Sequence, residues 1–133
     1  MSNVPLITAT YAAVLGLLAA ALTVNVIVNR VRLSVLSGDG GLPKMAQAIR
    51  AHANFAEQVP LALILIGLAE MTGIRSWIIY LLGGVLVVAR ALSALGLSRS
   101  LGASTPRQAG AGMTIAVTVL ASIAVFCGVL TMH

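Results

Sequence analysis

The stretch RAHANFAEQVP, residues 50–60, sets a cation, an amide and a carboxylate inside a region that is otherwise strongly apolar. On a helix, Arg50, Asn54 and Glu57 are spaced i, i+4 and i+7 and therefore share one face, whereas His52 points elsewhere. A charged side chain at the centre of a bilayer costs about 2.5–3.5 kcal/mol on insertion scales, so it usually marks a function or a forced pairing. The stretch predicts a polar binding surface on one face of a membrane helix.

The composition of the whole chain predicts a membrane protein. Hydrophobic residues make up 59% of the 133 residues and charged residues only 8%, against about 25% charged in soluble domains. The net charge of +5 does not indicate nucleic-acid binding, because the basic residues flank apolar runs. The single Cys127 excludes an internal disulfide, and His52 has no second ligand nearby, so no metal site is expected.

Four apolar runs, each near the ~20 residues that cross a bilayer, predict an all-α integral membrane four-helix bundle. Pro43 is expected to open the second helix, Gly73 to cap its end, and Pro60 to bend it just past the polar stretch. The chain is read as one transmembrane domain, residues 1–133, with spans at about 5–28, 43–72, 77–97 and 106–132.

The basic residues are distributed unevenly between the two ends of these spans. The first and third connections carry most of them, whereas the second connection offers only Arg75. The positive-inside rule therefore places residues 33–43 and 98–105 in the cytoplasm and both termini on the other side. Glu70 and Arg75 are expected to be a solvated pair of charges at the outer turn. The basic residues expected to contact lipid headgroups are Arg30, Arg32 and Lys44.

The embedded polar residues predict a positively charged cluster near the cytoplasmic ends of three spans. The arginine fork suits carboxylates, and Glu57 suits an ammonium group, so an anionic or zwitterionic ligand is expected. Arg107, at the second position of its helix, opposes the helix dipole, which suits the binding of an anion or a thiolate. A structural interpretation stays open, in which Arg50 and Glu57 pair with Arg90 or with each other.

The motif Arg50-x-His52-x-Asn54-x-x-Glu57-x-x-Pro60 resembles the signature of the MAPEG family, the membrane-associated proteins in eicosanoid and glutathione metabolism. The turn at residues 38–41 is similar to that of the bacterial branch, and Arg90 and Arg107 also match in position. The resemblance covers nearly the whole chain. It implies a left-handed four-helix bundle, assembled as a homotrimer in a bacterial inner membrane with both termini periplasmic.

The resemblance also implies that glutathione, as co-substrate, binds between neighbouring subunits near the cytoplasmic side. Arg107 matches the arginine that stabilises the thiolate, with Arg99 as the alternative. The other partners implied are membrane lipids, a lipophilic small-molecule substrate and, as a further candidate, a larger membrane complex, with no nucleic acid. The residues implied to hold glutathione are Arg50, Asn54, Glu57 and Arg90, together with Arg30 of an adjacent subunit.

The leading hypothesis is a glutathione-dependent membrane transferase or peroxidase that acts on a lipophilic electrophile. Three positions depart from the tyrosines of the family's enzymes, namely Gln58, Ser93 and Leu97. These departures favour the alternative, a non-catalytic membrane scaffold or an accessory subunit of a membrane complex. A small transporter fits less well, because the chain has no paired repeat or broken helices.

Overall fold

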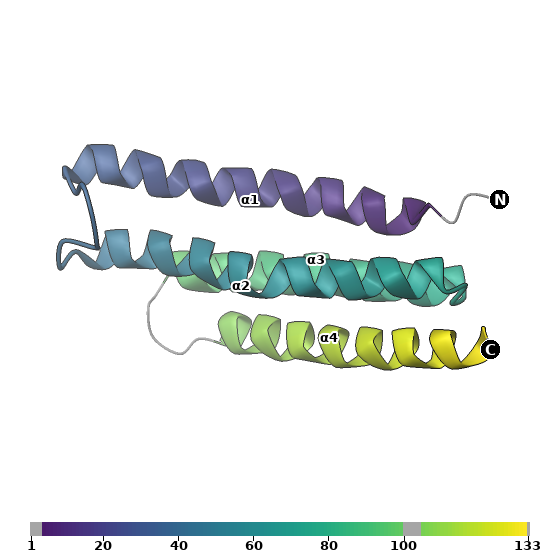
Figure 1. Cartoon of the computed structure of the whole chain (residues 1–133). Helices are drawn as coiled ribbons and strands as arrows, with labels where there is room; N and C mark the ends of the chain where they lie inside the picture. The colour runs from purple at the N-terminus through teal and green to yellow at the C-terminus, as the bar shows by residue number, and fades with distance from the viewer. Residues whose placement is uncertain (1–3, 100–104, 133) are drawn as a thin grey trace.

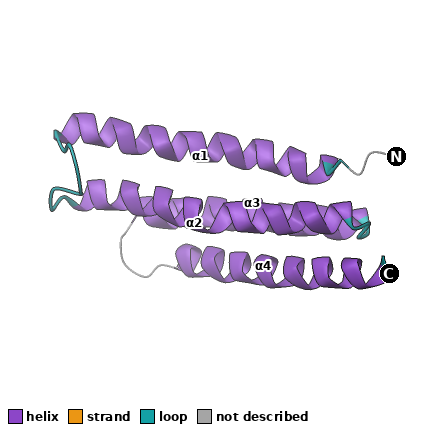
Figure 2. Ribbon diagram, viewed as in Figure 1, coloured by secondary structure: helices purple, strands orange, loops and turns teal. Residues whose placement is uncertain are grey.

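The computed structural model describes residues 4–99 and 105–132, with side chains described for 4–96 and 105–132. Within these ranges the chain forms helices and no strand (Figure 2). Each helix is long and apolar enough to cross a membrane, so the predicted all-α, four-helix membrane architecture is confirmed. The helices are α1 (Leu6–Leu33), α2 (Pro43–Met71), α3 (Ser76–Arg99) and α4 (Thr105–Thr131).

Helices α2 and α3 form the centre of the bundle, and α1 and α4 lie on opposite sides of it (Figure 1). Within the described residues α1 contacts α2 and α3, and α4 contacts the same two helices but not α1. The beginning of α1 and the end of α4 lie at one end of the bundle, opposite the 34–42 connection. The side of the membrane that each end faces stays a prediction from the basic residues.

Helix α1 is longer than the expected first span. It continues past Val28 to Leu33, because the polar residues there do not break the helix. The Asn29 side chain donates to the Asn25 carbonyl oxygen one turn earlier, at 2.8 Å. The helix ends where Ser34 takes a left-handed conformation, with φ of 54°.

The connection from α1 to α2 is a tight glycine turn. Gly40 has φ of 60°, and a Cβ at this position would lie 3.0 Å from the Val35 side chain, so glycine fits where other residues would not. Asp39 Oδ1 accepts a hydrogen bond from the Gly41 amide at 2.9 Å. Arg30 Nη1 donates to the Gly38 carbonyl at 3.2 Å and so ties the end of α1 to this turn.

Both ends of α2 follow the sequence prediction. Pro43 stands in the first turn, where its missing N–H is not needed. At the other end Gly73 has φ of 82°, and its N–H donates to the Glu70 carbonyl at 3.1 Å. The Ile74 N–H donates to the Ala69 carbonyl at 3.2 Å, which completes a Schellman motif. The helix continues through Pro60 without a break.

The predicted solvated pair of Glu70 and Arg75 is wrong. The Glu70 carboxylate accepts hydrogen bonds from the backbone N–H groups of Ile7 at 2.9 Å and Thr8 at 2.8 Å, and from the Thr8 hydroxyl at 2.6 Å. The first-turn N–H groups of a helix need outside acceptors, and Pro5 supplies none from its side chain. The antiparallel packing of α1 and α2 brings Glu70 to this position, while Arg75 stays exposed.

Candidate functional site

Arg90 of α3 is the centre of a buried polar cluster that joins three helices. Its side chain is 1% exposed. Nη1 donates to Asn54 Oδ1 of α2 at 2.8 Å, and Nη2 donates to the Gly110 carbonyl of α4 at 3.1 Å. Nη2 also donates to Ser93 Oγ at 3.1 Å and to Thr114 Oγ1 at 2.5 Å. A buried charge requires such partners, because it has lost its water.

The cluster depends on a close approach of α3 and α4. A Cβ at Gly110 would lie 2.2 Å from Ser93 Oγ and 2.5 Å from the Ala89 carbonyl oxygen. Only a residue without a side chain brings the backbone of α4 this near, and the Gly110 carbonyl then reaches the guanidinium. A second close approach lies beside the first turn of α4, where a Cβ at Gly96 of α3 would lie 2.9 Å from the Arg107 backbone nitrogen. Small residues therefore place α4 against Arg90.

The charge of Arg90 is not balanced by a carboxylate. In the described part of the chain no ion pair joins Arg90 to Asp39, Glu57 or Glu70, which are all the acidic residues of the sequence. Carbonyl, amide and hydroxyl oxygens stabilise the guanidinium instead, and its Nε has no partner among the described residues. The alternative in which Arg90 pairs with Glu57 is therefore not formed within the single chain.

The hydrogen bond from Arg90 fixes the orientation of the Asn54 side chain. Asn54 is half-buried on α2, and its Oδ1 is taken by the guanidinium. This bond orients the amide and leaves Nδ2 as a donor. Arg90 itself is almost fully buried, so in the single chain Asn54 is the more accessible of the two side chains.

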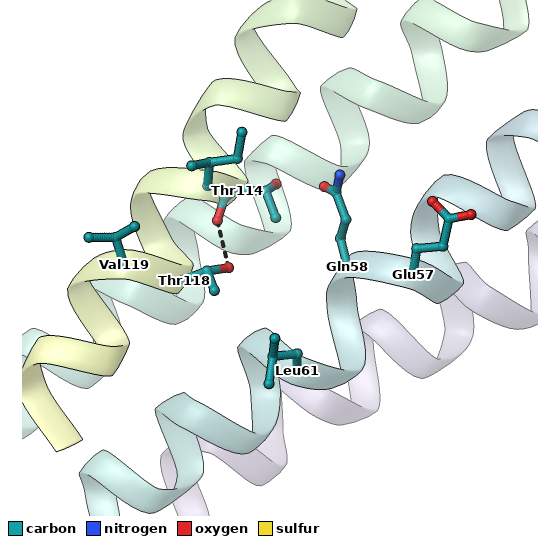
Figure 3. A pocket seen from close by; sticks show the side chains of 7 residues that line it. Glu57, Gln58, Leu61, Thr114, Thr118 and Val119 are labelled. Atoms are coloured by element: carbon teal, nitrogen blue, oxygen red, sulfur yellow. Dashed lines mark hydrogen bonds between the residues drawn. The ribbon is translucent and has the colours of Figure 1, made fainter. Parts of the chain in front are cut away.

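A cavity of about 220 Å³ adjoins this cluster between α2 and α4 (Figure 3). Thr114 belongs to both, because its hydroxyl accepts from Arg90 and also lines the cavity. In the view of Figure 3, Glu57 lies on the far side of Gln58 from α4. The lining residues are Glu57, Gln58, Leu61, Thr114, Ile115, Thr118 and Val119.

The polar atoms of α2 at this cavity lack partners in the described chain. Gln58 Oε1 is buried and accepts no hydrogen bond. Glu57 is exposed and makes no ion pair with a described residue. The Glu57 carboxylate and the Gln58 amide oxygen therefore accept no hydrogen bond from the described residues.

The remaining predicted site residues lie apart from this cavity. Arg50 is exposed one turn before Asn54 and lines a separate cavity with residues of the 34–42 connection, including Asp39. Arg30 is half-buried beside the same connection. Arg107 is half-buried in the first turn of α4, one turn from Gly110. The side chains of Arg99 and Leu97 lie outside the described residues.

Sequence reasoning missed the contributions of Ser93, Thr114 and Thr118. Ser93 counted only as a lost tyrosine, yet its hydroxyl is a partner of the Arg90 guanidinium. The signal was present in α4, where Gly110, Thr114 and Thr118 recur at i+4 spacing and thus share one face. Among the described residues, no group of three His, Cys, Asp or Glu side chains gathers as a metal site.

The fold and the site define a four-helix integral membrane protein with an arginine-centred polar cluster and an adjoining cavity between α2 and α4. Residues 8–127 match the sequence model of the MAPEG family. Two curated relatives, both named inner membrane protein YecN, come from Escherichia coli strains K12 and O6:H1 (CFT073). Each is 32% identical over 96 residues, which is 72% of this chain and 73% of the relative. The chain belongs to the MAPEG family.

Proposed function

We propose that this protein is a glutathione-dependent transferase or peroxidase of a bacterial inner membrane that acts on a lipophilic electrophile. The observation that carries the proposal is the exposed charge on α2. Arg50 and Glu57 are exposed on a membrane helix and form no ion pair with a described residue. Because unpaired charges are costly in a bilayer, their partner is expected from outside the chain. Membership of the MAPEG family supports glutathione as that partner.

The charges of glutathione complement those of α2. Its ammonium group suits the Glu57 carboxylate, a carboxylate suits the Arg50 guanidinium, and its peptide groups suit Asn54 Nδ2. Arg90 holds Asn54 in place from behind, at 2.8 Å. Arg107, in the first turn of α4, would stabilise the thiolate, which is the nucleophile that attacks the electrophile.

A homotrimer would complete this site. Arg50 and Glu57 line different cavities of the single chain, so a surface that covers both is expected from a neighbouring copy. Arg30 of that copy would supply a further cation. Both relatives are named as inner membrane proteins, which supports an inner-membrane location, and the basic connections support periplasmic termini.

The proposal is tested by calorimetric titration of the purified protein in detergent with glutathione. The wild type should bind glutathione, and Glu57→Gln should weaken binding by roughly tenfold or more, since a charged hydrogen bond is worth about 1.5–3 kcal/mol. Glu70→Gln is the control, because it also removes a carboxylate charge but lies in the last turn of α2, away from the cavity that Glu57 lines. Both variants should keep the oligomer of the wild type.

A non-catalytic scaffold is the second candidate, and the Arg90 cluster favours it. Asn54, Ser93 and Thr114 accept hydrogen bonds from the two terminal nitrogens of the guanidinium within one chain, so the cluster joins three helices without any ligand. If the wild type binds no glutathione and Glu57→Gln dissociates the oligomer, the scaffold explains the charges on α2 and the enzymatic proposal fails.

A further inference from the structure

The cavity between α2 and α4 contains a polar atom that no described part of the chain satisfies. Gln58 Oε1 is buried and accepts no hydrogen bond, and Gln58 lines this cavity of about 220 Å³. A buried acceptor without a donor destabilises the protein, because it has lost its hydrogen bonds to water. The missing donor is therefore expected from a molecule that occupies the cavity.

The two threonines of the cavity wall add acceptors rather than donors. The Thr118 hydroxyl donates to the Thr114 carbonyl at 2.9 Å (Figure 3), and the Thr114 hydroxyl donates to the Gly110 carbonyl at 2.9 Å. A hydroxyl group has one hydrogen, so both are used within α4. Thr114 Oγ1 also accepts from Arg90, which leaves the lone pairs of Thr118 Oγ1 for the cavity.

The rest of the lining is a carboxylate and an apolar wall. Glu57 accepts hydrogen bonds but cannot donate them when ionised. Leu61, Ile115 and Val119 are all more than half exposed on helices that cross the membrane, so this side of the cavity opens toward acyl chains. Among the lining residues, Gln58 Nε2 is the one side-chain donor that is not already used.

We infer that this cavity binds an apolar molecule that ends in a hydroxyl group, and that Gln58 selects for the hydroxyl. The single O–H hydrogen is donated to Gln58 Oε1, and Thr118 Oγ1 is the alternative acceptor for it. The hydrocarbon part packs on Leu61, Ile115 and Val119 and enters from the bilayer. A molecule of similar size that can only accept, such as an ether, leaves Gln58 Oε1 unsatisfied. The binding of this molecule is inferred from the cavity alone, whereas its role as the substrate rests on the proposed function.

The test compares 1-decanol with its methyl ether in the absence of glutathione. Saturable uptake of each radiolabelled probe is measured on protein in lipid nanodiscs, after subtraction of the uptake by protein-free nanodiscs. The wild type should bind the alcohol about fivefold to tenfold more tightly than the ether, because one net hydrogen bond is worth about 1 kcal/mol. Gln58→Met should lower the affinity for decanol to that for the ether and leave the ether affinity unchanged, which also shows that the variant is folded.

Two matched variants control for the loss of polarity. Gln47→Met removes an amide from α2 in a different cavity, and Thr23→Val removes a hydroxyl that makes the same i−4 bond in α1 as Thr118 makes in α4. Both should keep the preference for decanol, whereas Thr118→Val should reduce it.

Three results would overturn the inference: equal binding of the alcohol and the ether, a preference that survives Gln58→Met, or no saturable uptake of either probe. The last would be expected if a neighbouring subunit or a lipid chain filled the cavity. Failure to bind glutathione, with the decanol preference intact, would count against the proposed function alone.

Discussion

Arg90 carries a permanent charge at 1% exposure, and oxygens of three helices solvate it in place of water. Arg90→Met should destabilise the protein by about 2–4 kcal/mol, because Asn54 Oδ1 and Ser93 Oγ lose the guanidinium that donates to them. The loss would be measured as the shift in free energy of unfolding in mixed detergent micelles. Arg32→Met, at an exposed position near the end of α1, should change stability by no more than about 0.5 kcal/mol. Equal effects of the two variants would contradict the structural role of Arg90.

Arg107 lies in the first turn of α4, where the helix dipole already favours an anion. For the proposed enzyme, Arg107→Ala should raise the pKa of the bound glutathione thiol, since the thiolate loses a stabilising cation. At neutral pH less thiolate is then present, and turnover should fall by roughly tenfold for each increase of about 1 in the pKa of the thiol. The far-ultraviolet absorbance of the thiolate, titrated in the complex, reports this pKa directly. An identical titration for the wild type and free glutathione would exclude an activated thiolate.

At the scale of the helix, α3 and α4 are held together by small residues along one line of contact. Gly110→Ala should destabilise the protein by about 1–3 kcal/mol, because the new Cβ would meet Ser93 Oγ and the Ala89 carbonyl. Gly112→Ala is the matched control, since nothing lies within 4 Å of a Cβ at that position. It should be neutral or stabilise by up to about 1 kcal/mol, through helix propensity. Thermal unfolding of both variants, followed by circular dichroism, would distinguish the two outcomes.

The beginning of α1 depends on an acceptor from another helix. Glu70→Ala should cost about 1–2 kcal/mol, because the Ile7 and Thr8 amides lose their cap. Hydrogen exchange should show the loss first, as faster exchange confined to the first turn of α1. Glu70→Gln, which keeps one acceptor oxygen, should cost less, and Arg75→Ala should cost almost nothing. Unchanged exchange in Glu70→Ala would contradict the capping role.

At the scale of the whole molecule, we expect a neighbouring copy of the chain to cover the exposed charges of Arg50 and Glu57 on α2. Cysteine-free protein (Cys127→Ser), given single cysteines on exposed positions of α2, should form crosslinked species up to a trimer in native membranes. The physical reason is that lipid cannot pair with Arg50 and Glu57 at depth, whereas a second subunit can cover them. A chain that stays monomeric in membranes and in mild detergent would contradict this expectation.

The orientation in the membrane is a separate prediction at the same scale. Reporter domains inserted into the 34–42 connection should be cytoplasmic, and those fused to either terminus should be periplasmic. Arg30, Arg32 and Lys44 lie near the first connection, whereas the 72–75 turn has only Arg75, so the bias in basic charge is strong. A periplasmic signal from the 34–42 connection would invert the predicted topology.

The sequence alone determined the four membrane helices, the start of α2 at Pro43, its cap at Gly73 and the family. These features depend on local properties, namely runs of apolar residues, the fixed φ of proline and the left-handed freedom of glycine. Only the tertiary structure decided which polar groups meet. Arg90 and Asn54 are 36 positions apart, and Glu70 lies 63 positions from Ile7. Such pairs form because particular faces of two helices pack together. All four helices are apolar on most sides, as a membrane requires, so the sequence of one helix does not show which of its faces contacts a neighbour.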